Sequence, residues 1–207
     1  MAIHKYEDLT AMHLDVLKEV GNIGSGNAST ALSGMIQKDV LIEVPSVKVV
    51  GFQEAIDHAG GAERVVAGVL SRLYGGIEGM FLLLMEQDFV NLITNSFFGE
   101  EESDMLALNE NEISALSEIG NIMGGAYASA ISQLTGIEIR LAAPQYQADM
   151  LGALMSVPAI EFGEVGDKLL FIDKQIEIDN VSVKSNMMLI PTIESLETII
   201  TKLGLEV

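Results

Sequence analysis

The sequence contains no cysteine, few cations and few aromatic residues. The lack of cysteine excludes disulfides, thiolate metal sites and cysteine nucleophiles. The 11 lysines and arginines are outnumbered by 30 aspartates and glutamates, which gives a formal net charge of −19 at pH 7. An acidic surface repels nucleic-acid phosphates and anionic membranes, so we expect a protein partner, no nucleic acid and no membrane.

Long apolar runs are missing as well. The longest uninterrupted run, Met80 to Met85, is far too short to span a bilayer, and residues 1–15 lack the basic-then-apolar pattern of a signal peptide. We therefore expect a cytoplasmic protein. Aromatic residues make up 5% of the chain, which has 11 methionines, so the core should be aliphatic and methionine-rich.

Several familiar catalytic arrangements are also absent. The three histidines, His4, His13 and His58, have no metal-ligand spacing, and we expect each of them at the surface. No G-x-S-x-G or H-E-x-x-H motif occurs. The acidic run at residues 100–102 is expected to belong to a solvated linker, Gly99–Asp104, rather than to a cation site. We expect no cofactor and no metal ion of the protein's own.

The sequence does contain an internal repeat. Residues 15–45 align with residues 114–144 without a gap, so that residue 15 corresponds to residue 114, an offset of 99. The shared core, E-[VI]-G-N-I, is too unusual a combination to align by chance. It pairs Glu19 with Glu118 and Asn22 with Asn121.

Each half of the chain has the pattern helix, strand, variable middle, strand, helix. The halves span roughly 10–99 and 109–206 within a single domain, 1–207. Apolar patterning predicts strands at 40–52 with a break at Pro45, 65–74, 80–85, 169–178 and 181–190. The last two form a hairpin turned at Asp179-Asn180. We expect an α+β fold, internally duplicated and pseudo-two-fold symmetric, whose antiparallel sheet is covered by helices bearing the repeated motif.

The glycine-rich segment from Gly21 to Asn27 has the composition of a loop, or even of a phosphate cradle. It lacks the dinucleotide fingerprint and the P-loop lysine, and the second copy has Met123 where the first has Gly24. A helix explains both copies. Its buried face would carry Leu14, Leu17, Gly21, Gly24, Ala28, Ala31 and Met35 in the first copy, and Ile113, Leu116, Gly120, Met123, Tyr127 and Ala130 in the second.

The opposite face of each predicted helix places Glu and Asn one turn apart. A solvated helix face is the plain alternative, but Asn is a mediocre helix former, and its repetition beside a glycine favours a function. Asp15 and Ser114 are candidates to start or cap the helices, whose N-terminal ends the sequence does not define. This face would carry Asp15, Glu19, Asn22, Gly26 and Ser29 in the first copy and Ser114, Glu118, Asn121, Gly125 and Ala128 in the second.

A carboxamide donates and accepts hydrogen bonds together, so Asn22 and Asn121 suit the task of holding a water in line with a phosphorus atom. Glu19 and Glu118 can receive a partner's lysine or arginine and fix its orientation. Phosphoryl transfer depends mainly on positioning, and a partner can bring its own Mg²⁺. These residues suit an auxiliary phosphatase.

The motif, Asp or Ser followed by Glu, Asn and a distant Pro, resembles that of the CheC/CheX/FliY family of chemotaxis phosphatases, and its double occurrence resembles the CheC type. It is met by Asp15-Glu19-Asn22-Pro45 and by Ser114-Glu118-Asn121-Pro144. The resemblance implies that the substrate is the aspartyl phosphate of the response regulator CheY, which supplies the Mg²⁺. It also implies that the Asn residues orient the attacking water and that the Glu residues contact a lysine of the regulator.

The resemblance further implies a second partner, the receptor deamidase CheD, which would contact Gln145–Leu154, with Asp149 a candidate contact. An ordinary exposed acid is the alternative for Asp149. Two other functions stay open: a non-catalytic binding module of the chemotaxis or flagellar-switch apparatus, and a purely structural dimerisation protein. Because the repeat already contains the symmetry that a dimer would create, we expect a monomer.

Overall fold

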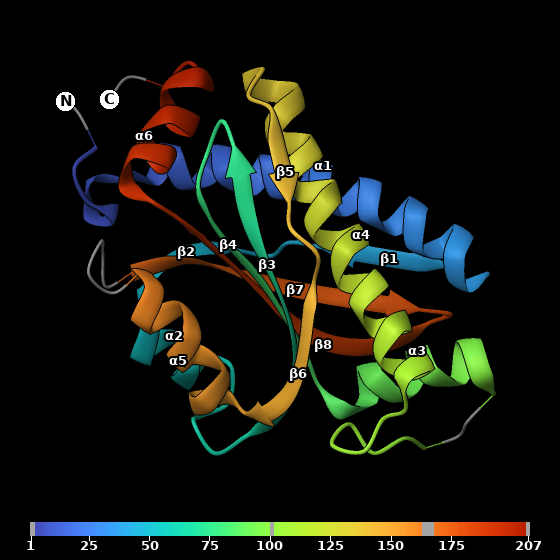
Figure 1. The fold of residues 1–207 in the computed structure, drawn as a ribbon. Coiled ribbons are helices and arrows are strands. Elements are labelled where there is room, and N and C mark those ends of the chain that lie inside the picture. Colours follow the sequence, from blue (N-terminus) through green and yellow to red (C-terminus); the bar gives the residue numbers. More distant parts are fainter. Residues whose placement is uncertain (1–2, 100–101, 163–167, 206–207) are drawn as a thin grey trace.

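The structure, a computed structural model, describes residues 3–99, 102–162 and 168–205, which form one antiparallel sheet with helices on both faces (Figure 1). Its strands are β1 (Val40–Glu43), β2 (Val47–Gly51), β3 (Val65–Gly75), β4 (Gly79–Met85), β5 (Ile139–Leu141), β6 (Gln145–Met150), β7 (Lys168–Ile178) and β8 (Val181–Pro191). The α-helices are α1 (Ala11–Ile36), α2 (Phe52–His58), α3 (Gln87–Phe98), α4 (Glu110–Thr135), α5 (Leu151–Phe162) and α6 (Ile193–Lys202). The predicted α+β class is confirmed.

The two halves of the chain complete each other's part of the sheet. At the centre, β4 of the first half pairs with β8 of the second, with Phe81 opposite Leu189. Strands β1 and β2 of the first half pair with β7, whereas β5 and β6 of the second half pair with β3. The element order α-β-β-α-β-β-α occurs twice, as an internal duplication would produce. The duplication itself, and its boundaries at roughly 10–99 and 109–206, stay predictions.

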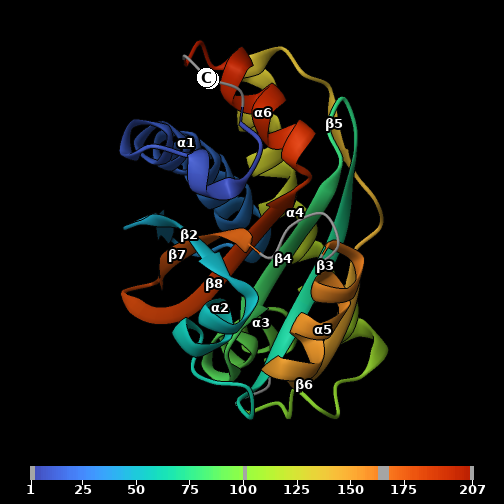
Figure 2. The same cartoon turned by 90° about the vertical axis from the view of Figure 1, so that its left-hand side faces the viewer.

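The sheet separates the core into two layers, each covered by its own helices. Helices α1, α3, α4 and α6 cover one face of the sheet, and α2 and α5 lie together on the other (Figure 2). Successive side chains of β4 alternate between them: Phe81 and Leu83 join the first layer, and Leu82 and Leu84 join the second. A strand covered on both faces is apolar throughout, which explains the longest apolar run of the sequence.

Two predicted features of the strands are confirmed. Strands β7 and β8 form a hairpin closed by Asp179 and Asn180, whose φ angles of 49° and 67° match a type I′ turn. Pro45 lies between β1 and β2, which both pair with β7. The proline therefore interrupts the strand without removing its continuation from the sheet.

The helices of the repeat begin earlier than their candidate caps. Thr10 caps α1 and Asn109 caps α4, so Asp15 and Ser114 lie inside the helices, on their exposed faces. The Thr10 backbone N–H donates to His13 Nδ1 at 3.1 Å, which completes a capping box. The expectation of a surface His13 was therefore wrong, since only 5% of the residue is exposed. His4 and His58 are exposed, as expected.

The predicted acidic linker falls partly outside the described residues, because Glu100 and Glu101 are not among them. Gly99 ends α3 in the left-handed conformation, with φ 73°. Glu102 and Asp104 are exposed, as expected of a solvated linker. Within the part of the chain that is described, no helix is both long and apolar enough to cross a membrane.

Candidate functional site

The two predicted Glu/Asn pairs lie on α1 and α4 with the same local arrangement. The Asn22 Nδ2 atom donates to Glu19 Oε2 at 3.4 Å, and the Asn121 Nδ2 atom donates to Glu118 Oε2 at 3.3 Å. Asn22 and both glutamates are exposed, and Asn121 is half-buried. Each carboxamide has a second N–H and a carbonyl oxygen, so it can hold a further ligand while bonded to its glutamate.

Helices α1 and α4 pack directly on each other, and a glycine permits their close approach. A Cβ atom at Gly24 would lie 3.1 Å from Cδ2 of Tyr127, tighter than most such contacts. The hydroxyls of Ser25 and Tyr127 form a buried hydrogen bond of 2.8 Å. Burial holds the pKa of the Tyr127 phenol well above its ordinary value, so the phenol stays protonated. The predicted buried faces, with their small residues, therefore pack α1 and α4 together, so both Glu/Asn pairs lie on one packed unit.

Two positions on these helices differ from the prediction. Ala31 is exposed and lies in the part of α1 whose serines contact β1. There Ser29 Oγ accepts from the Ile42 N–H and Ser33 Oγ accepts from the Val40 N–H, each at 3.0 Å. Ala128 is buried instead of exposed, since α4 packs against α1, β3 and β5, which widens its buried arc.

The glycines beyond each Glu/Asn pair face open space. No atom lies within 4 Å of a Cβ built at Gly26 or at Gly125. Neither glycine is therefore needed for packing within the described residues. Both leave the backbone of the helix accessible beside the pair.

A hollow of about 570 Å³ lies beside the second pair. Three members of the second motif line it: Ser114, Glu118 and Pro144. Met35 at the end of α1 and Phe98 at the end of α3 add an apolar wall from the other half of the chain. Sequence reasoning did not place these two residues at the site, because nothing in the repeat relates them to Glu118.

A lysine lies buried beneath the contact between α1 and α4. Lys174 of β7 is 6% exposed, and its Nζ atom lies 4.3 Å from the centre of the Tyr127 ring. Within the described part of the chain, Nζ has no hydrogen-bond partner. Burial lowers the pKa of Lys174 to about 7, because the charged form loses its hydration. Its alternating position in a predicted strand did not distinguish this lysine from an exposed one.

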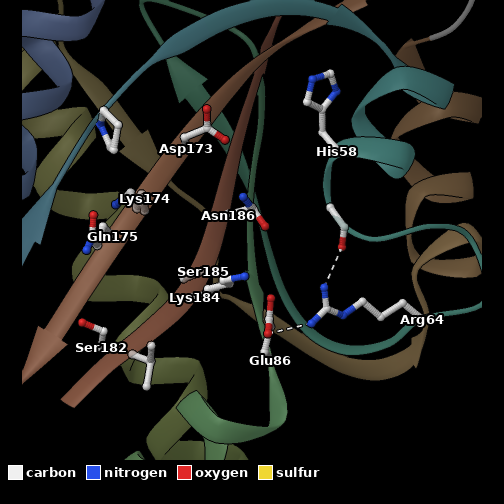
Figure 3. A pocket seen from close by; sticks show the side chains of 13 residues that line it. His58, Arg64, Glu86, Asp173, Lys174, Gln175, Ser182, Lys184, Ser185 and Asn186 are labelled. Carbon is white, nitrogen blue, oxygen red and sulfur yellow. Dashed lines mark hydrogen bonds and ion pairs between the residues drawn. The ribbon is translucent and has the colours of Figure 1, made fainter.

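A second hollow, of about 490 Å³, lies on the other side of the sheet, between the end of α2 and strands β7 and β8 (Figure 3). Three of its charged side chains form ion pairs: Arg64 with Glu86 at 2.6 Å, and Asp173 with Lys48 at 3.0 Å. Lys174 and Lys184 also line the hollow. Most of the other residues that line it from β7 and β8 are polar, for example Gln175. Pro45 of the first motif lines this hollow, whereas neither Glu/Asn pair does.

Asp149, the candidate CheD contact, lies in β6 opposite Val66 of β3 and is half-buried. Its Oδ1 atom accepts from the N–H of Met150 at 2.7 Å. The predicted contact segment, Gln145–Leu154, combines β6 with the first turn of α5. The structure thus places Asp149 on a different element from either Glu/Asn pair. Among the described residues, no group of three or more acidic, histidine or cysteine side chains is placed to hold a metal ion.

Known proteins resemble the chain over nearly its whole length. The model of the CheC-like family matches residues 12–49 and 112–146, the two stretches that contain the Glu/Asn pairs. The CheY-P phosphatase CheC of Bacillus subtilis (strain 168) is 31% identical over 195 residues, covering 92% of this chain and 93% of that protein. This match extends the similarity well beyond the motifs themselves.

Solved structures share the fold. Thermotoga maritima FliY matches with a TM-score of 0.75 and 24% identity, over 95% of this chain and 98% of that one. The FliM middle domain of H. pylori matches with a TM-score of 0.67 and 13% identity, over 94% and 99% of the two chains. At these identities the likeness concerns the fold alone.

Proposed function

The chain belongs to the CheC-like family, and we propose that it is a phosphatase that hydrolyses the aspartyl phosphate of the chemotaxis response regulator CheY. The observation that carries this proposal is the recurrence of one arrangement. Each Glu/Asn pair lies at i and i+3 on a packed helix, beside an open glycine. A relative that is 31% identical bears the name CheY-P phosphatase, which supports the same activity here.

In this proposal, Asn22 and Asn121 orient the attacking water. Each carboxamide has a carbonyl oxygen that can accept from the water and an N–H that can donate to it. The water oxygen forms a bond to phosphorus while the bond between phosphorus and the aspartyl oxygen breaks, so that inorganic phosphate and a free aspartate result. The chain forms no covalent intermediate, and its contribution to the rate is positioning.

Glu19 and Glu118 dock the regulator by receiving a lysine next to its phosphorylated aspartate. Both carboxylates are exposed and hold only a weak bond, of 3.3–3.4 Å, to the neighbouring Asn. A lysine of the partner can therefore reach them without breaking a strong contact. The regulator brings the Mg²⁺ that neutralises the phosphoryl charge, as in other phosphoryl transfers.

The second partner is the deamidase CheD, at Gln145–Leu154 with Asp149 as a contact. Met150 in this segment is 50% exposed and supports a protein contact there. We further propose that the protein works as a monomer in the cytoplasm. The exchange of β1, β2, β5 and β6 between its halves supports the monomer, since each half already supplies strands to the other.

A non-catalytic binding module of the flagellar switch is the alternative function. The fold likeness to the FliM middle domain favours it, because that fold is not confined to proteins named as phosphatases. The alternative keeps the same docking face but assigns no water to the asparagines. It predicts that the protein binds the phosphorylated regulator without changing the lifetime of the phosphate.

The test is to phosphorylate CheY chemically and to follow its loss of phosphate with and without this protein. Wild type should accelerate the loss, and the double variant Asn22→Ala/Asn121→Ala should not, while still folding and still binding. The two single variants then assign the activity to one pair or to both. Binding without acceleration by wild type would overturn the proposed hydrolysis in favour of the binding module.

A further inference from the structure

The hollow beside Glu118 joins polar motif residues to an apolar wall. Ser114 and Glu118 lie on the α4 side, whereas Phe98 and Met35 come from the ends of α3 and α1. Among the described residues that line it, Glu118 alone is charged. The hollow therefore offers one carboxylate and, a short distance away, an apolar surface.

Phe98 is a fixed aromatic surface on this wall. It is 43% exposed, although the burial of a phenylalanine side chain away from water lowers the free energy. It is the last residue of α3, which Gly99 ends with φ 73°, and its ring packs at 6.0 Å from the ring of Phe97. Phe97 is itself packed against the core. An exposed aromatic ring on rigid support loses little conformational entropy when a partner covers it, which makes it a good anchor.

The corresponding surroundings of the first pair are different. At the offset of 99, Ser117 next to Glu118 corresponds to Lys18 next to Glu19, and Ser114 corresponds to Asp15. The end of α3 corresponds to the end of α6, where Leu203 and Gly204 follow the helix and no aromatic residue occurs. The aromatic part of the wall thus belongs to the second pair, since Leu134 and Leu203 are the residues at the places of Met35 and the end of α3.

We propose that the hollow beside Glu118 receives one exposed apolar side chain of the phosphorylated regulator, with Phe98 and Met35 as specificity-determining residues. This inference rests on the proposed function, because it names how the same partner docks. Glu118 belongs both to the hollow and to the Glu118/Asn121 pair, and its negative charge complements a partner lysine that lies next to an apolar residue. Regulators that lack an apolar residue at that place are then poor partners for the second pair.

The experiment measures the dissociation constant for CheY held in its activated state by beryllofluoride, a phosphoryl mimic that is not hydrolysed. Two backgrounds separate the pairs: Glu19→Arg blocks docking at the first, and Glu118→Arg blocks docking at the second. Phe98→Ala is introduced into each. Ile160→Ala, which removes an apolar side chain that is 78% exposed on α5, serves as the matched control.

In the Glu19→Arg background, Phe98→Ala should weaken binding about tenfold, the loss typical of a truncated aromatic anchor. In the Glu118→Arg background it should have no effect, and Ile160→Ala should have none in either. An unchanged dissociation constant in the first background, or an equal loss in both, would overturn the inference. Because binding of the beryllofluoride form needs no hydrolysis, this assay can support the inference even where the dephosphorylation assay shows no phosphatase activity. Likewise, it can overturn the inference where that assay shows phosphatase activity.

Discussion

The hydroxyl of Tyr127 on α4 forms a hydrogen bond of 2.8 Å with the hydroxyl of Ser25 on α1. This bond joins the two helices that carry the Glu/Asn pairs, three residues beyond Asn22 and six beyond Asn121. Its position makes it a link between the two candidate sites. The two halves differ here, since the repeat places Ala28 opposite Tyr127 and Gly124 opposite Ser25.

Tyr127→Phe should lower the free energy of unfolding by about 1–2 kcal/mol, because it leaves the buried Ser25 hydroxyl without this partner. Urea denaturation measures the change. Tyr74→Phe is the control, since that tyrosine is 46% exposed and should tolerate the loss of its hydroxyl. Equal stability of Tyr127→Phe and wild type would show that the bond contributes nothing.

Alanine substitution at two glycines of α4, Gly120 and Gly125, should change the stability of the protein in opposite directions. A Cβ at Gly120 would lie 2.3 Å from Cγ1 of Val69, so Gly120→Ala should destabilise the protein by about 1–3 kcal/mol through overpacking. Gly125 meets no atom within 4 Å, so Gly125→Ala should stabilise it by about 0.5–1 kcal/mol. Thermal or urea unfolding of the two variants compares them directly. Destabilisation by Gly125→Ala would contradict the open space beside that glycine.

The buried Lys174 should make stability depend on pH. Burial lowers its pKa to about 7 in the folded protein from an ordinary value of 10.5, so between these values the unfolded chain binds more protons. Stability therefore rises with pH across this window, and below pH 7 the cost of burying the charge is fully present. Lys174→Met should be more stable than wild type near pH 7, and its advantage should shrink as the pH approaches 10.

Urea unfolding of both proteins at pH 7, 8 and 9 tests this prediction, since their difference cancels the titration of other groups. Lys184→Met is the matched control, because Lys184 is exposed on the adjacent strand. A stability difference between Lys174→Met and wild type that does not change with pH would contradict a lowered lysine pKa.

The sequence predicted the helices of the repeat because two copies could be compared. Met123 at the place of Gly24 removed the phosphate-loop interpretation, and the i, i+3 spacing then placed Glu and Asn on one exposed face. The strands followed from alternation and from the turn at Asp179-Asn180. Such local signals are complete within a short segment, so they do not depend on the rest of the fold.

Features that depend on distant parts of the chain could not be predicted. Helix α5 is apolar on nearly all sides and contains Pro158, so it shows no helical period. The exchange of strands between the halves has no local signature. Neither does the hollow at Glu118, which needs Phe98 and Met35 to meet α4, or the burial of Lys174, which depends on Tyr127 covering it.

The most direct test of the proposed division of labour is the steady-state kinetics of CheY dephosphorylation by paired variants. Asn22→Ala/Asn121→Ala should lower kcat at least a hundredfold with KM nearly unchanged, because the asparagines position water and the glutamates dock the regulator. Glu19→Ala/Glu118→Ala should chiefly raise KM. A double asparagine variant that retains the wild-type kcat would contradict the account, since the water would then be positioned without either carboxamide.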